Sequence, residues 1–292
     1  MGYGSTTQIV KQYTSHGFGV ARTRAAALGG EHAAAEKDKV RYPTGPSSNM
    51  QREIVNQLTK ALKNEPSVHA MWLEGSMAKS SNDELSDVDL WIDVDNGNDK
   101  KIYSLVEKVL SGFGEIDTNY NARLEHSELQ HRIYHLKDTS EYHIYEIVVQ
   151  SHSRKFVFTT GTHEIEVLFD KDNTVQWKDF NEAAVKKELE SREKYLRQTL
   201  ILGKPIIDKQ LKRGKYIDAF GYYIKWSLEP LIELARIRHC PRKTDRWIKD
   251  IELDLPAKIV YQIQPLFKVS SLADISKNVR VALNLAKSFI DD

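Results

Sequence analysis

The sequence predicts an α+β domain with a small mixed sheet, followed by an all-α helical bundle. Two observations predict this order. Short apolar or alternating segments, typical of strands, occur between residues 68 and 169 and then stop. Beyond Trp177, apolar residues instead recur at helical spacing over long stretches. The length of 292 residues is sufficient for two domains of ordinary size.

We expect three parts in the chain: a flexible tail and linker over residues 1–48, an α+β domain over 49–175, and a helical domain over 176–292. The tail is rich in glycine and alanine and ends in a Pro-Thr-Gly-Pro-Ser-Ser sequence. Its first 30 residues hold three basic residues and no acid, as in an organelle transit peptide, but it lacks the apolar core of a secretory signal. We favour a flexible extension or a cloning scar.

The α+β domain opens with a helix, because Ile54, Leu58 and Leu62 share one helical face and Asn64-Glu65-Pro66 ends the pattern. The next segments are too short for helices, and several alternate between apolar and polar residues. One later segment has a helical period. We expect strands over 68–73, 88–94, 133–136, 143–149, 155–159 and 164–169, and a helix over 102–110.

The C-terminal part is expected to be a bundle of amphipathic helices. These stretches cover residues 180–202, 205–213, 215–239, 256–268 and 271–290. Pro230 removes a backbone donor inside the third of them, which predicts a kink near Leu228.

Composition excludes several classes of function. Lysine and arginine number 42 against 41 acids, so any attraction for nucleic acid must come from local clusters. No apolar run approaches the roughly 18 residues of a membrane helix, so no membrane partner is expected. The single cysteine, Cys240, excludes an internal disulfide and fits a reducing, cytoplasmic location. We expect Cys240 to be a small buried residue and not a nucleophile.

The segment most informative about chemistry begins with a Gly-Ser turn at Gly75 and Ser76 and continues to Asp87 and Asp89. Alternate residues of a strand share a face, so the two carboxylates are expected to project together. Like charges at that distance raise each other's pKa, and a hard divalent cation removes this cost. The pair therefore predicts a magnesium site.

The Gly-Ser turn has the features of a triphosphate seat. Gly75 lets the backbone approach a ligand closely, and Ser76 with nearby backbone N–H groups can surround a phosphate. Lys79 adds a positive charge. The alternative interpretation of the acidic pair is a solvated edge strand whose charges discourage aggregation.

The motif consists of a Gly-Ser turn, ten further residues and then Asp-x-Asp on a strand. It resembles the nucleotidyltransferase superfamily that shares the DNA polymerase beta catalytic fold. The resemblance covers about residues 50–170. It implies a third carboxylate on a later, adjacent strand between apolar residues, and Glu146 fits this position. A solvated edge strand accounts for neither the Gly-Ser spacing nor the third acid.

Within the superfamily, a catalytic core joined to C-terminal helices resembles the antibiotic-modifying adenylyltransferases of the aminoglycoside and lincosamide group. The segments that carry this likeness are Tyr134–Leu136, Gln150–Arg154, Val167–Asp170, Glu229–Leu231 and Asp254–Pro256. The resemblance implies transfer of AMP from ATP to a hydroxyl of a small molecule, with pyrophosphate leaving. Antibiotic resistance is the biological role it implies.

The same resemblance implies roles for the three acids. Two magnesium ions would clamp the reacting oxygens. Asp87 and Asp89 would hold the ion that orients the triphosphate. Glu146 would either bind the second ion or accept the hydroxyl proton, and the sequence leaves both roles open.

Two charged groups of the helical domain are further candidates, on the acceptor side of an interdomain cleft. If residues 215–239 form one helix, an acidic stripe there can hold a cationic acceptor such as an aminoglycoside; a solvated stripe is the equal alternative. Its residues are Asp218, Tyr222, Glu229 and Glu233. Residues 236–249 hold six basic residues against one acid. Lys243 or Lys249 is expected to reach the triphosphate, and an RNA backbone is the next candidate.

Three functions remain open. The first is a magnesium-dependent adenylyltransferase acting on a small molecule. The second is transfer to a macromolecule, tRNA or protein, as in toxin-type relatives; the basic cluster favours it, while the lack of an RNA-binding module disfavours nucleic acid. The third is a catalytically silent nucleotide-binding protein. A zinc site at His131 and His135 is disfavoured, because HExxH is absent and the segment has a strand pattern. A homodimer and a monomer are expected equally.

Overall fold

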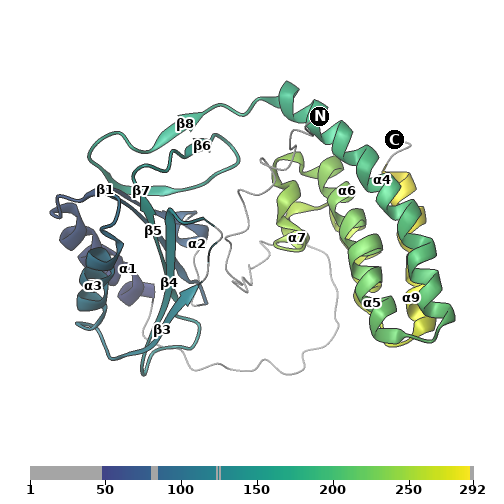
Figure 1. Cartoon of the computed structure of the whole chain (residues 1–292), viewed down its shortest axis with the longest axis horizontal. Helices are drawn as coiled ribbons and strands as arrows, with labels where there is room; N and C mark the ends of the chain where they lie inside the picture. The colour runs from purple at the N-terminus through teal and green to yellow at the C-terminus, as the bar shows by residue number, and fades with distance from the viewer. Residues whose placement is uncertain (1–47, 80–84, 123, 125, 290–292) are drawn as a thin grey trace, which may run out of the picture. The chain divides into compact units, whose positions relative to one another are not determined.

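A computed structural model describes residues 48–79, 85–122, 124 and 126–289. These residues form two compact units, one up to Asp179 and the other from Phe180 onward. Each unit is described by itself below (Figure 1). The expected tail over residues 1–48 lies outside the described residues, except for Ser48, which begins the first helix.

The first unit is built on a mixed sheet of six strands in the order β3-β4-β5-β2-β1-β7. The central pair, β2 and β5, is parallel, and the other neighbours are antiparallel. The strands are β1 (Val68–Glu74), β2 (Val88–Val94), β3 (Ile116–Ala122), β4 (Leu129–Leu136), β5 (Tyr145–Ser151) and β7 (Glu166–Asp170).

Two helices, α1 (Ser48–Lys63) and α3 (Asp99–Leu110), lie together on one face of this sheet (Figure 1). Their apolar residues pack on alternate strand residues such as Leu90 and Ile147, which are fully buried. A short helix, α2 (Gly75–Ala78), follows β1 directly. Because this core takes every second residue of β2, the residues between them face the other way.

The opposite face is covered in part by a small parallel pair, β6 (Val157–Thr159) and β8 (Gln176–Lys178). Phe158 from β6 is buried against Trp72 of β1, and Trp91 of β2 packs against the same group. The sheet therefore has a large core, mostly aliphatic, on its helical side and a smaller aromatic cluster on the side that carries Asp89.

All six expected strands and both expected helices of this unit are present, with ends that differ by a few residues. Two strands were not expected. The middle of β3 is exposed and reads Asp-Thr-Asn-Tyr-Asn, so it has no apolar period to detect. All three residues of β8 are exposed as well. Both strands are set by backbone pairing with neighbours and not by burial of their own side chains.

The second unit is helical, as expected. Its elements are α4 (Glu182–Lys212), α5 (Tyr216–Tyr223), a π-helical turn (Ile224–Leu228), α6 (Glu229–His239), a 3₁₀ turn (Pro241–Arg246), α7 (Ile251–Asp254), α8 (Ala257–Ile263), a 3₁₀ turn (Gln264–Phe267) and α9 (Leu272–Ser288). Its core includes Tyr223, Leu231 and Ile275, each at most 1% exposed.

Two expectations for these helices were wrong. Residues 180–202 and 205–213 do not form separate helices, because α4 continues through Pro205. Residues 215–239 do not form one uninterrupted helix, because the π-helical turn separates α5 from α6. The irregularity expected near Leu228 is present. Pro230 falls at the start of α6, directly after the π-helical turn, where its missing N–H leaves one donor fewer for the carbonyls of that turn.

No helix among the described residues has the length and apolar character needed to cross a bilayer.

Candidate active site

The acidic residues expected from the sequence meet at the start of the two parallel strands. Asp89 of β2 is the direct register partner of Glu146 of β5. Neighbouring strands lie about 4.8 Å apart, so the two side chains leave the same face side by side. Asp87 lies directly before β2, while Val88 and Leu90 are fully buried on the helical side. The structure thus places Asp89 beside Glu146, with Asp87 one residue before the start of β2.

Gly75 is pressed against one of these acids. Its φ is +69°, and a Cβ placed on it would lie 2.0 Å from Oδ2 of Asp89. No side chain fits there unless the carboxylate moves, so the glycine is required both by backbone conformation and by space. Ser76 follows in α2 and is partly buried. The Gly-Ser turn and the Asp-x-Asp strand therefore form one local structure.

A fourth acid, Glu74, was missed by the sequence reasoning. In the antiparallel pairing of β1 with β2 it stands directly opposite Asp89, so Asp89 has a carboxylate on each neighbouring strand. The indole N–H of Trp72 donates a hydrogen bond to Oε1 of Glu74 over 3.2 Å. Alternation along 68–74 places Glu74 on the same face as Trp72, and this signal could have identified it.

Glu146 has a histidine partner. Nε2 of His131 on β4 lies 3.2 Å from Oε2 of Glu146, and both side chains are largely buried. His135, four residues further on, instead contacts Asp117 and the carbonyl of Ser140. The two histidines that raised a zinc alternative thus have separate partners.

The donor set suits a hard divalent cation, since its carboxylate oxygens are the ligands that magnesium prefers. Among the residues that the structure describes, no group of three or more His, Cys, Asp or Glu side chains is arranged to hold a metal ion. Glu146 is directed toward His131 and so departs from the three-acid arrangement expected from the sequence.

Lys79, expected beside the triphosphate, forms an ion pair with Glu164, with 2.7 Å between Nζ and Oε2. Arg52 of α1 likewise binds both carboxylate oxygens of Glu166. The charge of each of these cations is therefore offset by a neighbouring acid.

The basic cluster of the second unit is also largely paired. Lys243 contacts Oδ1 of Asp254 at 2.5 Å, and the fully buried Arg236 contacts Oδ2 of the same residue at 2.8 Å. Burial raises the pKa of Asp254, but its hydrogen bonds to Lys243 and Arg236 outweigh this and hold the pKa below its usual range. Further pairs are Arg242 with Glu182 and Arg246 with Asp250.

Arg236 organises the segment that carries these charges. Its guanidinium donates to the backbone carbonyls of Trp247, Lys243 and Lys249. Beside it, burial raises the pKa of the Cys240 thiol, which agrees with a structural cysteine. Lys249 itself forms no ion pair within residues 180–289, so of the two lysines expected at the triphosphate it is the less engaged.

The expected acidic stripe is interrupted by the π-helical turn. A π-turn holds one more residue than an α-turn, so α6 is rotated by about 100° relative to a continuous helix. Asp218 and Tyr222 precede this turn, and Glu229 and Glu233 follow it. The four residues therefore do not share the single face expected from the sequence.

The partners of the stripe residues also differ. Glu233 binds Arg192 of α4 through both oxygens, at 2.6 and 2.8 Å. Asp218 lies 3.6 Å from Lys215, and Tyr222 is 39% exposed. Burial and the nearby Glu233 raise the pKa of Glu229, against the opposing effect of Lys225.

The geometry of the first unit has a counterpart among known families. Residues 56–152 match the family model described as Polymerase beta, Nucleotidyltransferase. The chain contains a nucleotidyltransferase domain. This match spans β1, α2, β2 and β5 and thus includes Gly75, Asp89 and Glu146. It confirms the expected fold class and the expected enzyme class, a nucleotidyltransferase.

Solved structures show a distant likeness to the whole chain. An aminoglycoside 6-adenyltransferase from Bacillus subtilis is 12% identical, with 84% of this chain and 89% of that chain covered and a TM-score of 0.32. A nucleotidyltransferase-like protein from Exiguobacterium sibiricum is 11% identical, with 83% and 74% covered and a TM-score of 0.30. A putative nucleotidyltransferase from H. pylori is 13% identical, with 83% and 94% covered and a TM-score of 0.27. No curated protein matches the sequence. Likeness at this level does not identify a substrate.

Proposed function

We propose that the protein transfers AMP from ATP to a hydroxyl group of a small molecule, with Asp87, Asp89 and Glu146 at the centre of the site. The observation that carries the proposal is the position of Asp89. It is the register partner of Glu146, and its carboxylate lies against Gly75 of the nucleotidyltransferase domain.

In this reaction the acceptor oxygen forms a bond to the α-phosphorus, the bond from that phosphorus to the bridging oxygen breaks, and pyrophosphate leaves. Glu146 accepts the proton of the acceptor hydroxyl, and His131 lies beside its carboxylate. Ser76 and the backbone beside Gly75 bind phosphate oxygens. Glu74 adds negative charge beside Asp89, which strengthens the demand for a cation at this position.

Asp87 and Asp89 are the residues that would hold magnesium, with Glu146 as the second candidate ligand. When bound, two magnesium ions would neutralise charge on the phosphates and stabilise the leaving pyrophosphate. The oxygen donors on adjacent strands support this assignment.

We propose a cationic, hydroxylated acceptor, such as an aminoglycoside, with a lincosamide as the second compound class. Glu229 and Tyr222 are the exposed candidates for binding it, since Glu233 is already held by Arg192. Transfer to tRNA or protein has less support, because acids neutralise most of the basic cluster around Arg236.

The test is transfer of label from α-labelled ATP in the presence of magnesium to aminoglycosides, lincosamides, bulk tRNA and the protein itself. We expect label on a small molecule and release of pyrophosphate, and Asp89→Asn should abolish both. Glu141→Gln, which removes an exposed acid of the same unit, is the matched control and should retain activity. Unchanged turnover in Asp89→Asn would contradict the assignment. Label on RNA or protein would establish the macromolecular acceptor instead.

A further inference from the structure

Arg154 stands apart from the other cations of the first unit. Within residues 48–79, 85–122, 124 and 126–179, each other lysine or arginine is either exposed or paired with an acid, whereas Arg154 is partly buried and forms no ion pair. Burial lowers the pKa of its guanidinium, against the opposing charges of Glu128, Glu74 and Asp93. A partly dehydrated cation without a partner is unfavourable unless another interaction compensates for it.

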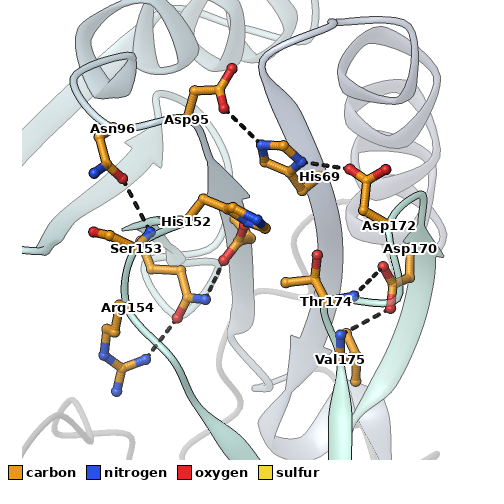
Figure 2. A network of polar contacts seen from close by, with 12 residues as sticks. His69, Asp95, Asn96, His152, Ser153, Arg154, Asp170, Asp172, Thr174 and Val175 are labelled. Atoms are coloured by element: carbon orange, nitrogen blue, oxygen red, sulfur yellow. Dashed lines mark hydrogen bonds and ion pairs between the residues drawn. The ribbon is translucent and has the colours of Figure 1, made fainter.

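The side chain is held from two sides by aromatic rings and from behind by a hydrogen-bond chain. Its guanidinium carbon lies 4.9 Å from the centre of the Phe156 ring and 6.0 Å from that of Trp91. One N–H donates to Oε1 of Gln150 over 2.7 Å, and Nε2 of Gln150 donates to Oδ2 of Asp93 over 2.5 Å. Figure 2 shows Arg154 at one end of this chain, with His152 nearby.

The base of the chain is rigid. Asp93 is fully buried in β2, and its other oxygen lies 2.6 Å from Nδ1 of His152. Gln150 is the register partner of Asp93 on β5. The orientation of Arg154 is therefore set by the central strand pair, the same pair that positions Asp89 and Glu146.

The location of the guanidinium links it to the carboxylates. Trp91 follows Asp89 by two residues and shares its face of β2, and its ring stacks on that of Trp72 at 5.9 Å. Trp72 in turn donates to Glu74. Arg154 thus lies beside Trp91, which is two strand residues from Asp89 on the same face of β2.

Cation–π contacts alone compensate for part of the burial but leave most of the guanidinium donors unused. Of the five N–H groups, the described residues accept a hydrogen bond from one. A planar guanidinium with open donors matches two oxygens of a phosphate group. Lys79 is already engaged by Glu164, whereas Arg154 supplies positive charge on this face without a direct ion pair among the described residues.

We propose that Arg154 binds the phosphate groups of the donor nucleotide and that Gln150 is its positioning residue. This inference rests on the proposed function, because the phosphates are those of the triphosphate whose α-phosphorus is attacked.

The experiment measures binding of magnesium-ATP, inorganic pyrophosphate and adenosine to the full chain by titration calorimetry. We compare the wild type with Arg154→Met, Arg154→Lys and the matched control Lys155→Met, which removes an exposed cation one residue away. Arg154→Met should weaken ATP and pyrophosphate binding by about tenfold or more, since a charge-assisted hydrogen bond is lost. Adenosine binding should not change, Arg154→Lys should be intermediate, and Lys155→Met should match the wild type.

Equal pyrophosphate and ATP affinities in the wild type and Arg154→Met would overturn the inference while leaving the proposed function intact. A variant that loses only thermal stability would show a purely structural cation–π role and would also overturn it. Absence of ATP and pyrophosphate binding in the wild type would remove both proposals. Gln150→Leu gives a second readout: it should raise the KM for ATP several-fold and leave adenosine binding unchanged.

Discussion

Gly75 determines where the carboxylate of Asp89 lies. Its left-handed φ and the 2.0 Å approach of Asp89 Oδ2 to a Cβ position are separate constraints, and both are met by glycine alone. The conformation brings the backbone to the start of α2 while leaving room for the acid. Any side chain at this position displaces the carboxylate of Asp89 from its present place between β1 and β5.

We predict that Gly75→Ala lowers the rate of nucleotidyl transfer by about 100-fold, because displacement of a reacting group by about 1 Å has an effect of this size. Gly97→Ala is the matched control. Gly97 also has a positive φ, +82°, but nothing lies within 4 Å of its Cβ position. Both variants should lose about 1–2 kcal/mol of stability from the backbone change. Steady-state kinetics and chemical denaturation separate the two effects, and equal activity of the variants would contradict the steric explanation.

His69 is a titratable residue at the far end of the same strands. Its ring contacts Asp172 through Nδ1 at 2.6 Å and Asp95 through Nε2 at 2.9 Å, and it stacks on His152 (Figure 2). Burial lowers its pKa, but the hydrogen bonds to Asp172 and Asp95 and the charge of Asp93 outweigh this, so the pKa is raised above 6.5. Both nitrogens must carry protons to donate to both acids.

The sign of the pH dependence follows from this raised pKa. The charged ring contributes stability fully below pH 6.5, and the contribution is lost as the pH rises through the raised pKa of the folded protein. We predict that His69→Gln costs about 1–2 kcal/mol at pH 6 and clearly less at pH 9. Urea denaturation at both pH values measures this. His126→Gln, an exposed histidine, should show no such difference, and a pH-independent effect at His69 would contradict the prediction.

The Gly-Ser turn and the Asp-x-Asp strand could be located in the sequence, and Glu146 was expected from the resemblance to the nucleotidyltransferase superfamily. The place of Glu74 opposite Asp89 and the position of Arg154 could not be predicted. Glu74 follows from the register of β1 against β2, which the sequence does not specify. Arg154 follows β5, and its guanidinium contacts Trp91 of β2 and Phe156, which precedes β6. Contacts between separate elements decided both positions.

The irregular part of the helical unit has a packing origin. Gly203 of α4 faces Trp226 in the π-helical turn, and a Cβ on Gly203 would lie 2.6 Å from both Cβ and the carbonyl oxygen of Trp226. Helix α4 and the π-turn therefore touch backbone to backbone. The additional residue in the π-turn is where the helix between Tyr216 and His239 departs from α-helical geometry.

We predict that Gly203→Ala destabilises the helical unit by about 1–3 kcal/mol, since the carbonyl oxygen and Cβ of Trp226 are fixed by the backbone and cannot rotate away. Gly221→Ala in α5 is the matched control, because nothing lies within 4 Å of its Cβ position. That change should be neutral or stabilising by up to about 1 kcal/mol. Thermal unfolding followed by circular dichroism measures both. A neutral Gly203→Ala would show that the two helices are not held at this separation.

At the level of elements, the sequence predicted the helices and strands that bury a periodic apolar face. It did not predict β3, whose residues are mostly exposed, or the joining of two segments into α4 through Pro205. It also predicted one helix where the π-turn intervenes, and with it a single acidic stripe. Strand β3 was missed because it forms by pairing with β4 without burying an apolar face. Helix α4 and the π-turn were missed because tertiary packing overrides local preference.

At the scale of the whole molecule, each unit has a core of its own. The first core packs α1 and α3 on the sheet around residues such as Leu58 and Leu90. The second gathers residues of α4, α5, α6 and α9, including Tyr223 and Leu231. The residues that we assign to the nucleotide, Gly75, Ser76, the acids and Arg154, all belong to the first unit. The sequence also suggested Lys243 and Lys249 for the nucleotide, and these two residues belong to the second unit.

This division leads to a prediction for the isolated first unit. A fragment of residues 48–179 should unfold cooperatively and bind magnesium-ATP within about threefold of the full chain, because Lys243 is already neutralised by Asp254. It should lose transfer to the acceptor if Tyr222 and Glu229 bind that molecule. Calorimetry of the fragment, of the full chain and of a Lys249→Met variant of the full chain provides the comparison. A tenfold loss of ATP affinity in both the fragment and Lys249→Met would assign Lys249 to the triphosphate. The same loss in the fragment alone would instead mean that the helical unit is needed to keep the first unit in its binding conformation.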